Sequence, residues 1–245
     1  MEVLEERFLP DGSLSHEEME AMQHDIAETA VFADAVEFDT EDISSGGAIV
    51  AGVDQAFLDD RAVSAVVVLR GDEVIARASA VTPLSIPYIP GLLAFREGEP
   101  IVAALETLDV TPDLLVFDGS GRIHFREAGI ATHIGVLFDV PAVGVAKSLL
   151  CGTPRESVDA LAEGERVAIE ADDLMTSPNG EVVGYAHQSR QYPNSMKINP
   201  LYVSAGHQLS SATAVDCVEA CGGEYKLPRP TRLADAYADE LKTDL

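Results

Sequence analysis

The sequence has 245 residues, 47% of them hydrophobic, which is enough to bury the core of one domain of ordinary size. Its 42 Asp and Glu against 16 Lys and Arg give a net charge of −26, which opposes phosphate binding if the charge is spread evenly. No run approaches the ~20 apolar residues of a membrane span, and the acidic N-terminus lacks the order of a signal peptide. We therefore expect a cytoplasmic protein that does not enter a membrane.

The charge is distributed unevenly along the sequence. Residues 1–45 contain 14 acids and one base, Arg7, whereas residues 118–151 balance three acids with three bases. An acidic, Lys-poor and Trp-free composition resembles that of proteins from halophilic organisms, where salt shortens electrostatic range to a few Å. Close contacts would then carry any binding to nucleic acid.

The three cysteines, Cys151, Cys217 and Cys221, are odd in number and have no paired metal-binding spacing. The i,i+4 pair of Cys217 and Cys221 suits small apolar side chains on one helix. We expect neither a disulfide nor a zinc site.

Local patterns predict an acidic, mobile lead-in over residues 1–14 and a single domain over residues 15–245. A capping-box sequence at Ser15 to Glu18 opens a helix. The sheet then begins with β-rich runs at 48–57, 62–69 and 73–80, whose spacings suit an antiparallel meander. The elements expected next are a helix beginning near Pro100, a strand at 114–117, a helix at 129–138 and a strand at 140–146.

The second half of the chain continues this mixture of strands and helices. Beyond Cys151 we expect a short polar helix and then a hairpin of residues 166–170 and 182–189. A strand over 200–207, a helix over 210–221 and a last helix from about Thr231 complete the chain. Three antiparallel strands followed by α/β units is the order of an RNase H-like mixed sheet flanked by helices, which is the α/β fold we predict.

Three carboxylates stand where apolar segments end. Asp118 follows a buried-strand pattern and precedes Gly119 and Gly121, Asp54 closes another apolar run, and Glu97 follows a third. Taken alone, Asp118 and Gly119 could equally form a turn that leaves a strand. An acid at the inner end of a strand is costly unless a cation meets it. Carboxylates converging from separate strands suit Mg²⁺, with Mn²⁺ as a substitute.

Basic side chains lie in the same motifs as these acids. A carboxylate cluster without nearby bases would suit calcium storage, but Arg96, Lys147 and His207 accompany this one. Each has an ordinary alternative: a surface charge for Arg96, a strand-end lysine for Lys147 and a satisfied core histidine for His207. Together with a divalent ion, which polarises phosphates and lowers the pKa of bound water, they favour phosphate chemistry.

Eight ordered motifs of the chain resemble the endonuclease V family, over roughly residues 17–240. They are AGVD (51–54), YIPGLLAFRE (88–97), PDLLVFDGSG (112–121), GIATHIGV (129–136), PAVGVAKS (141–148), GY (184–185), YVSAGH (202–207) and PTRLAD (230–235). The resemblance implies an RNase H-like fold and a Mg²⁺-dependent DNA repair enzyme. Such an enzyme cuts the second phosphodiester bond 3′ to a deaminated base, chiefly deoxyinosine.

The resemblance also assigns catalytic roles to five residues. Asp54, Glu97 and Asp118 would be the metal ligands. His207 would lie beside the attacking water or a second metal, and Lys147 would face the scissile phosphate.

Further residues would bind the substrate. Tyr88 lies in a proline-flanked wedge that, in the family, inserts between strands and stabilises the gap left by a flipped base. The residues assigned to the hypoxanthine pocket and its surroundings are Gly91, Leu93, Gly119, Gly121, His124 and Ile130. Two positions depart from the common family pattern: Ser120 replaces a His and Ala205 replaces a Pro.

Other functions stay open at this stage. One is a related RNase H-like nuclease that acts on inosine-containing RNA or other DNA structures, and another is a non-catalytic nucleic-acid-binding module. The wedge favours the inosine-directed DNA nuclease over the first, and the complete set of acids disfavours the second. We expect a monomer whose partner is DNA with deaminated bases.

Overall fold

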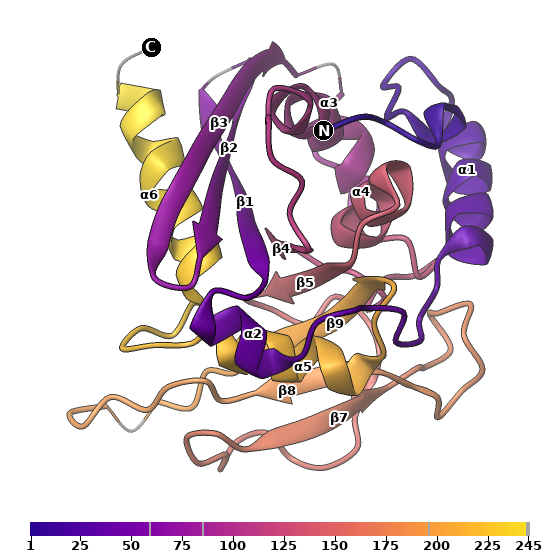
Figure 1. Cartoon of the computed structure of the whole chain (residues 1–245). Coiled ribbons are helices and arrows are strands. Elements are labelled where there is room, and N and C mark those ends of the chain that lie inside the picture. Colours follow the sequence, from indigo (N-terminus) through magenta and orange to yellow (C-terminus); the bar gives the residue numbers. More distant parts are fainter. Residues whose placement is uncertain (59, 85, 196, 244–245) are drawn as a thin grey trace.

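A computed structural model describes residues 1–58, 60–84, 86–195 and 197–243 (Figure 1). The helices are η1 (Glu6–Phe8), α1 (His16–Thr29), α2 (Thr40–Ser45), α3 (Leu93–Glu106), α4 (Ile130–Phe138), α5 (Ser211–Ala220) and α6 (Arg229–Thr243). The strands are β1 (Ile49–Leu58), β2 (Arg61–Arg70), β3 (Glu73–Pro83), β4 (Leu114–Asp118), β5 (Ala142–Ala146), β6 (Thr153–Pro154), β7 (Arg166–Glu170), β8 (Val182–His187) and β9 (Leu201–His207). No helix in these ranges is long and apolar enough to cross a bilayer.

The strands form one mixed sheet in the order β3-β2-β1-β4-β5-β9-β8-β7-β6. β1, β2 and β3 are antiparallel, as predicted, then β4 pairs in parallel with β1 and β5 pairs in parallel with β4. β9 runs antiparallel to β5, which places the start of β9 beside the end of β5. The predicted mixed sheet flanked by helices is confirmed.

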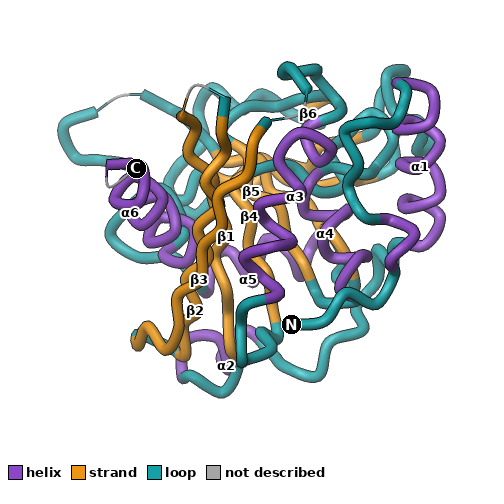
Figure 2. Tube along the Cα trace, turned by 90° about the horizontal axis from the view of Figure 1, so that it is seen from above, coloured by secondary structure: helices purple, strands orange, loops and turns teal. Residues whose placement is uncertain are grey.

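The alternation of side chains divides the core into two layers. Val53 of β1 and Phe117 of β4 face a layer that includes side chains of α3 and α4. Their neighbours Val50 and Val116 face the opposite layer, which is closed by α2 and α5. Figure 2 shows α3 on one side of β1 to β3 and α6 on the other. Because side chains of a strand alternate with a period of two, parity alone tells which layer a strand residue faces.

The N-terminal segment packs against the domain. The amino group of Met1 donates to the carbonyl of Leu108 at 2.7 Å, and Phe8 is buried in the core beside α4. His133 of α4 contacts the carbonyl of Phe8 at 2.7 Å. The lead-in expected to be mobile is therefore held by backbone hydrogen bonds and one buried aromatic ring.

Three local expectations differ from the structure. α3 begins at Leu93, so Pro100 lies inside the helix, because the apolar residues before Pro100 add a buried face that extends the helix backwards. The polar helix expected beyond Cys151 is absent from the described residues. The Ser157 hydroxyl there accepts from the Asp159 amide at 3.2 Å and favours a turn. The short α2 was not predicted, although Asp39 opens it with a capping box.

Candidate active site

Strand register brings Asp54 and Asp118 together. Val53 pairs with Phe117 in the parallel ladder of β1 and β4, and the two aspartates come next on each strand. By parity Asp54 faces the same side as Ala56, which packs against α6, and Asp118 faces the layer of α5, as does Lys147, which follows β5. The carboxyl ends of parallel strands are where open α/β sheets bind ligands, so this end of the sheet is the candidate site.

Asp54 is a buried carboxyl with little to compensate its charge. Burial and, after it, the nearby Asp118 raise the pKa of Asp54 to about 8. One favourable contact is the Gln55 amide, which donates to the Asp54 carboxylate at 2.8 Å. A buried acid that repels its neighbour is the condition that an added cation relieves.

Glu97 reaches the same end of the sheet from α3. It is buried, and burial raises its pKa to about 7, although the guanidinium of Arg96 lies 3.1 Å away and opposes the shift. The charge of Asp118 raises the Glu97 pKa further, which shows that the two carboxyls are close. Arg96 also lies 4.8 Å above the Phe57 ring, so this predicted basic residue is held at the site.

Lys147 contacts Asp118 directly, with 2.5 Å between Nζ and Oδ2. Partial burial lowers the pKa of Lys147, but the hydrogen bond and charge of Asp118 outweigh burial and raise it overall. The side chain is half exposed, so it can approach a bound anion from solvent.

A fourth acid, Asp235 on α6, was missed by the sequence analysis. Its side chain raises the pKa of Asp54, and its charge raises the pKa of Lys147. α6 can lie this close because Gly52 has no side chain: a Cβ there would stand 2.1 Å from the Pro230 carbonyl. Asp235 could have been noticed, because it ends the motif PTRLAD. The sequence alone, however, does not show that this helix residue lies beside the ends of β1 and β4.

His207 does not join the site. It pairs with Ala142 at the start of β5, whereas Val145, the partner of Asp118, pairs with Val203. Three residues of β5 separate the two levels, which is about 10 Å. The reason is strand direction: β9 is antiparallel, so its last residue lies at the opposite end of the sheet from the acids.

At that opposite end His207 has structural contacts. Its Nε2 lies 3.0 Å from the Asp139 carboxylate, and its Nδ1 accepts from the Val31 amide at 3.2 Å. The alternative of a satisfied core histidine is therefore what the structure shows.

The predicted substrate residues gather in a second place, on the α3 and α4 side of the sheet. A small pocket of about 50 Å³ is lined by Tyr88, Gly91, Leu93, His124 and Ile130. Ser120, one of the two departures from the family pattern, also lines it. The Tyr88 side chain is 63% exposed, as an inserting wedge requires.

Gly119 and Gly121, which were also predicted to line the pocket, are not part of its lining but pack closely against neighbouring elements. A Cβ on Gly119 would meet the Ile130 side chain at 2.6 Å, and one on Gly121 would meet the carbonyl of Ala205 at 2.3 Å. Both positions therefore require glycine for close packing.

Gln23 of α1 was also missed. Buried in the pocket wall, it donates to the Gly91 carbonyl at 2.7 Å and accepts from Arg126 Nε at 2.7 Å. His124 holds the same carbonyl, with Nε2 at 3.0 Å, and its Nδ1 accepts from the Arg126 amide. Burial lowers the pKa of His124 to about 4, so the ring is neutral and Nε2 carries its proton. Helix periodicity marks Gln23 as one polar residue among many, so the sequence offered no signal for it.

The acid set fits a hard cation in the chemistry of its donors, which are all carboxylate oxygens. As the side chains stand, however, no three His, Cys, Asp or Glu residues within the described ranges are arranged to hold a metal ion. Lys147 occupies one oxygen of Asp118, and Asp235 contacts Asp54. Holding an ion would require these contacts to open.

Comparison with known proteins gives the family. Its sequence model, endonuclease V, matches residues 32–236. The endonuclease V of Natronomonas pharaonis, a halophilic archaeon, is 71% identical over 242 residues, covering 99% of this chain and 98% of that protein. The crystal structure of Bacillus subtilis endonuclease V has a TM-score of 0.83 at 26% identity, covering 100% of this chain and 98% of that one. Ciona intestinalis endonuclease V, in complex with a 24mer DNA containing an inosine followed by a ribo-adenosine, has a TM-score of 0.76 at 28% identity and covers 94% and 98%. The chain therefore belongs to the endonuclease V family.

Proposed function

We propose that this protein is a metal-dependent DNA repair endonuclease that recognises deoxyinosine and hydrolyses the second phosphodiester bond 3′ to it. The observation that carries the proposal is the pairing of two sites across one sheet end. A glycine-lined pocket with an exposed tyrosine lies on one side, and Asp54 and Asp118 with Lys147 face the other. Family membership and the inosine-containing DNA bound by the Ciona protein support it.

We propose Mg²⁺ as the metal, with Mn²⁺ as a substitute, held by Asp54 and Asp118 with Glu97 and Asp235 beside them. Oxygen donors match the preference of these ions, and the raised pKa values of Asp54 and Glu97 indicate buried carboxyls whose negative charge is incompletely compensated. When bound, such an ion polarises the phosphate and lowers the pKa of a bound water.

The chain's own groups have separable tasks. Lys147, now bound to Asp118, would turn its ammonium toward the scissile phosphate and stabilise its negative charge. Tyr88 would fill the space left when the lesion base leaves the stack. Gln23 and His124 fix the Gly91 carbonyl, so this pocket wall is positioned before the base arrives.

Inosine-containing RNA is a second candidate substrate. The observation that favours it is the nucleic acid bound by the Ciona protein, in which a ribo-adenosine follows the inosine. A 2′-hydroxyl next to the lesion is therefore compatible with binding in that relative, and a substrate comparison separates the two possibilities for this chain.

The test uses a labelled duplex with a single deoxyinosine, a matched duplex with deoxyadenosine and a strand with a ribonucleotide after the inosine. Each is incubated in high KCl with Mg²⁺ or with EDTA, and the cut is mapped. We expect one cut, at the second phosphodiester bond 3′ to the lesion. It should appear only in inosine substrates and only with the metal. Equal cutting of the deoxyadenosine duplex would reject inosine recognition, and full activity in EDTA would reject the metal.

A further inference from the structure

Three of the four lysines of this acidic protein gather near the active site. The four are Lys147, Lys197, Lys226 and Lys242. Lys197 lies in the loop between β8 and β9, and Lys226 lies in the loop before α6. Because Ala146 at the end of β5 pairs with Tyr202 at the start of β9, the loop that holds Lys197 leads to the strand end that Lys147 follows. Burial lowers the pKa of Lys226, and the charges of Lys197 and Lys147 lower it further. With 42 acids available, lysines that repel one another indicate a place kept for an anion.

The two loops are joined to each other, so the lysines sit on a defined surface. The Lys226 amide donates to the Tyr192 hydroxyl oxygen at 3.3 Å, and the Ser189 hydroxyl donates to the Lys226 carbonyl at 2.7 Å. Figure 1 shows both loops projecting on the same side of the molecule, below α6. Among the residues that the structure describes, neither Lys197 nor Lys226 forms an ion pair.

Exposed aromatic rings accompany these lysines. Tyr192 and Tyr225 are 46% and 53% exposed, and Tyr88 of the wedge is the other tyrosine among the exposed large apolar side chains of the described chain. The Arg232 guanidinium lies 4.3 Å from the centre of the Tyr225 ring. Tyr225 also lines two adjoining hollows of about 320 and 380 Å³. Aromatic rings interleaved with cations are how proteins hold unpaired nucleic acid strands.

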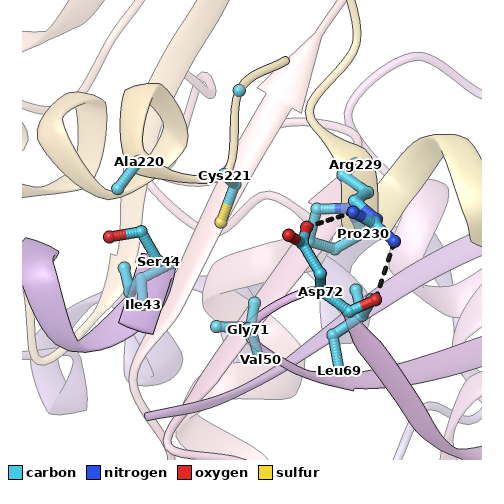
Figure 3. Close-up of a pocket in the computed structure, with 11 residues that line it drawn as sticks. Ile43, Ser44, Val50, Leu69, Gly71, Asp72, Ala220, Cys221, Arg229 and Pro230 are labelled. Carbon is cyan, nitrogen blue, oxygen red and sulfur yellow. Dashed lines mark hydrogen bonds and ion pairs between the residues drawn. The ribbon is translucent and has the colours of Figure 1, made fainter. Parts of the chain in front are cut away.

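Arg229, beside these residues, does not contribute to the surface. It is bound to the side chain of Asp72, and its Nη2 donates to the Asp72 carbonyl at 2.7 Å (Figure 3). This pair ties the β2–β3 turn to the start of α6. The acids that line these hollows are Asp72, which pairs with Arg229, Glu163, which pairs with Arg190, Glu219, which pairs with Arg166, and the exposed Glu224.

We propose that Lys197, Lys226, Tyr192, Tyr225 and Arg232, here called the lysine–tyrosine surface, bind the DNA strand that continues 3′ of the scissile phosphate. The base pocket lies on the α3 and α4 side of the sheet, and Asp54, Asp118 and Lys147 face the α5 and α6 side. A strand whose lesion base occupies the pocket and whose 3′ phosphate reaches the acids continues toward the loops before β9 and α6. This proposal rests on the proposed function, because the position of the cut sets which part of the strand arrives there.

The first test measures binding without cleavage. A labelled single-stranded oligonucleotide without inosine is titrated with protein in EDTA over a range of KCl concentrations. Lys197→Gln with Lys226→Gln should weaken binding about tenfold and reduce the slope of log K against log salt by about 1. Tyr225→Ala should weaken binding about five- to tenfold. Lys242→Gln, which removes an exposed lysine from the last turn of α6, should change neither value.

The second test measures cleavage and locates the surface along the strand. Two duplexes with one deoxyinosine are compared under single-turnover conditions. In one duplex the labelled strand continues for about one helical turn beyond the cut. In the other duplex the strand ends with the single nucleotide that lies 3′ of the cut. The variants should require more enzyme for half-maximal rate on the long substrate and behave as wild type on the short one.

The outcomes separate this proposal from the proposed function. If wild type cuts neither duplex but the lysine and tyrosine variants still lose strand binding, the proposed nuclease function is rejected. The surface would then still bind a nucleic acid strand, but its assignment to the strand 3′ of the cut would be rejected. Unchanged binding in these variants, equal losses in Lys242→Gln, or equal losses on both duplexes would overturn the surface. Displacement of the oligonucleotide by polyglutamate as readily as by unlabelled DNA would instead assign it to acidic proteins. Unfolding midpoints within a few degrees of wild type confirm that each variant is folded.

Discussion

The two ends of strand β5 each hold an aspartate beside a basic residue, and they differ in every other respect. At its carboxyl end Lys147 contacts Asp118, among buried carboxyls whose pKa values are raised. At its amino end His207 contacts Asp139, and the ring also accepts from a backbone amide. The first pair is under electrostatic stress that a ligand can relieve, whereas the second is already satisfied. A catalytic arrangement is thus recognised by its unmet charge and by strand direction, because residue types alone do not separate the two ends.

The largest expected effect comes from the same substitution, Asp to Asn, made at each of the two ends of β5. Asp118→Asn removes a charge from the proposed metal site and should lower the rate of inosine-directed cleavage by at least about a thousandfold, since the ion contributes several kcal/mol of charge stabilisation. Asp139→Asn makes the same chemical change at the other end and should leave the rate within about twofold. Single-turnover cleavage with saturating enzyme measures both variants.

Binding gives a second readout for this pair of variants. DNA affinity of Asp118→Asn in EDTA should match that of wild type, because the loss lies in chemistry. If Asp139→Asn lost as much rate as Asp118→Asn while remaining folded, the division of labour between the two ends of β5 would be wrong.

A smaller effect is expected at the pocket side of the active end. Tyr88→Ala removes the exposed ring, and because base stacking on an aromatic ring is worth ~1 to 3 kcal/mol, cleavage of the inosine duplex should fall roughly tenfold to a hundredfold. The loss should be smaller on single-stranded substrate, where no partner strand has to be held apart. Tyr88→Phe keeps the ring and should retain most of the activity. A full loss in Tyr88→Phe would show that the hydroxyl, and not stacking, matters.

How far the sequence predicts this molecule follows from which interactions are local. The meander, the order of later strands and the placement of Asp54, Asp118 and Lys147 were readable, because alternation and strand order determine them. The direction of β9 was not readable, so nothing in the sequence opposed the role beside the acids that the family resemblance implied for His207. Asp235 and Gln23 reach their sites through helix packing against distant strands and loops, and no local pattern reports such contacts.

A substitution of His207 tests the role of the amino end of β5. His207→Ala leaves the Val31 amide without its acceptor and removes the contact with Asp139, which should lower the free energy of unfolding by about 1 to 3 kcal/mol. Cleavage well below the unfolding temperature should stay near the wild-type rate, since His207 lies about 10 Å along β5 from the level of the acids. His207→Gln, which can still accept from Val31, should recover part of the stability. A rate loss of a hundredfold in a folded His207→Gln protein would return this residue to the active site.

The smallest effect concerns His133, which packs α4 against the N-terminal segment and contacts the Phe8 carbonyl. Burial lowers the pKa of His133 to about 4, from an ordinary value of 6.5, so between these values the unfolded chain binds a proton that the folded protein does not. Stability therefore falls as the pH drops through this window, by about 1 kcal/mol from pH about 6.5 to about 5.5. Asp54 and Glu97, whose pKa values are raised, change the stability with pH in the opposite sense. The contribution of His133 is therefore measured as the difference in free energy of unfolding between wild type and His133→Gln, from denaturant unfolding at each pH.

This difference in free energy should narrow as the pH falls. His24→Gln, an exposed control on α1, should give a curve of stability against pH that is parallel to wild type. Parallel curves for His133→Gln as well would mean that this buried ring keeps its ordinary pKa.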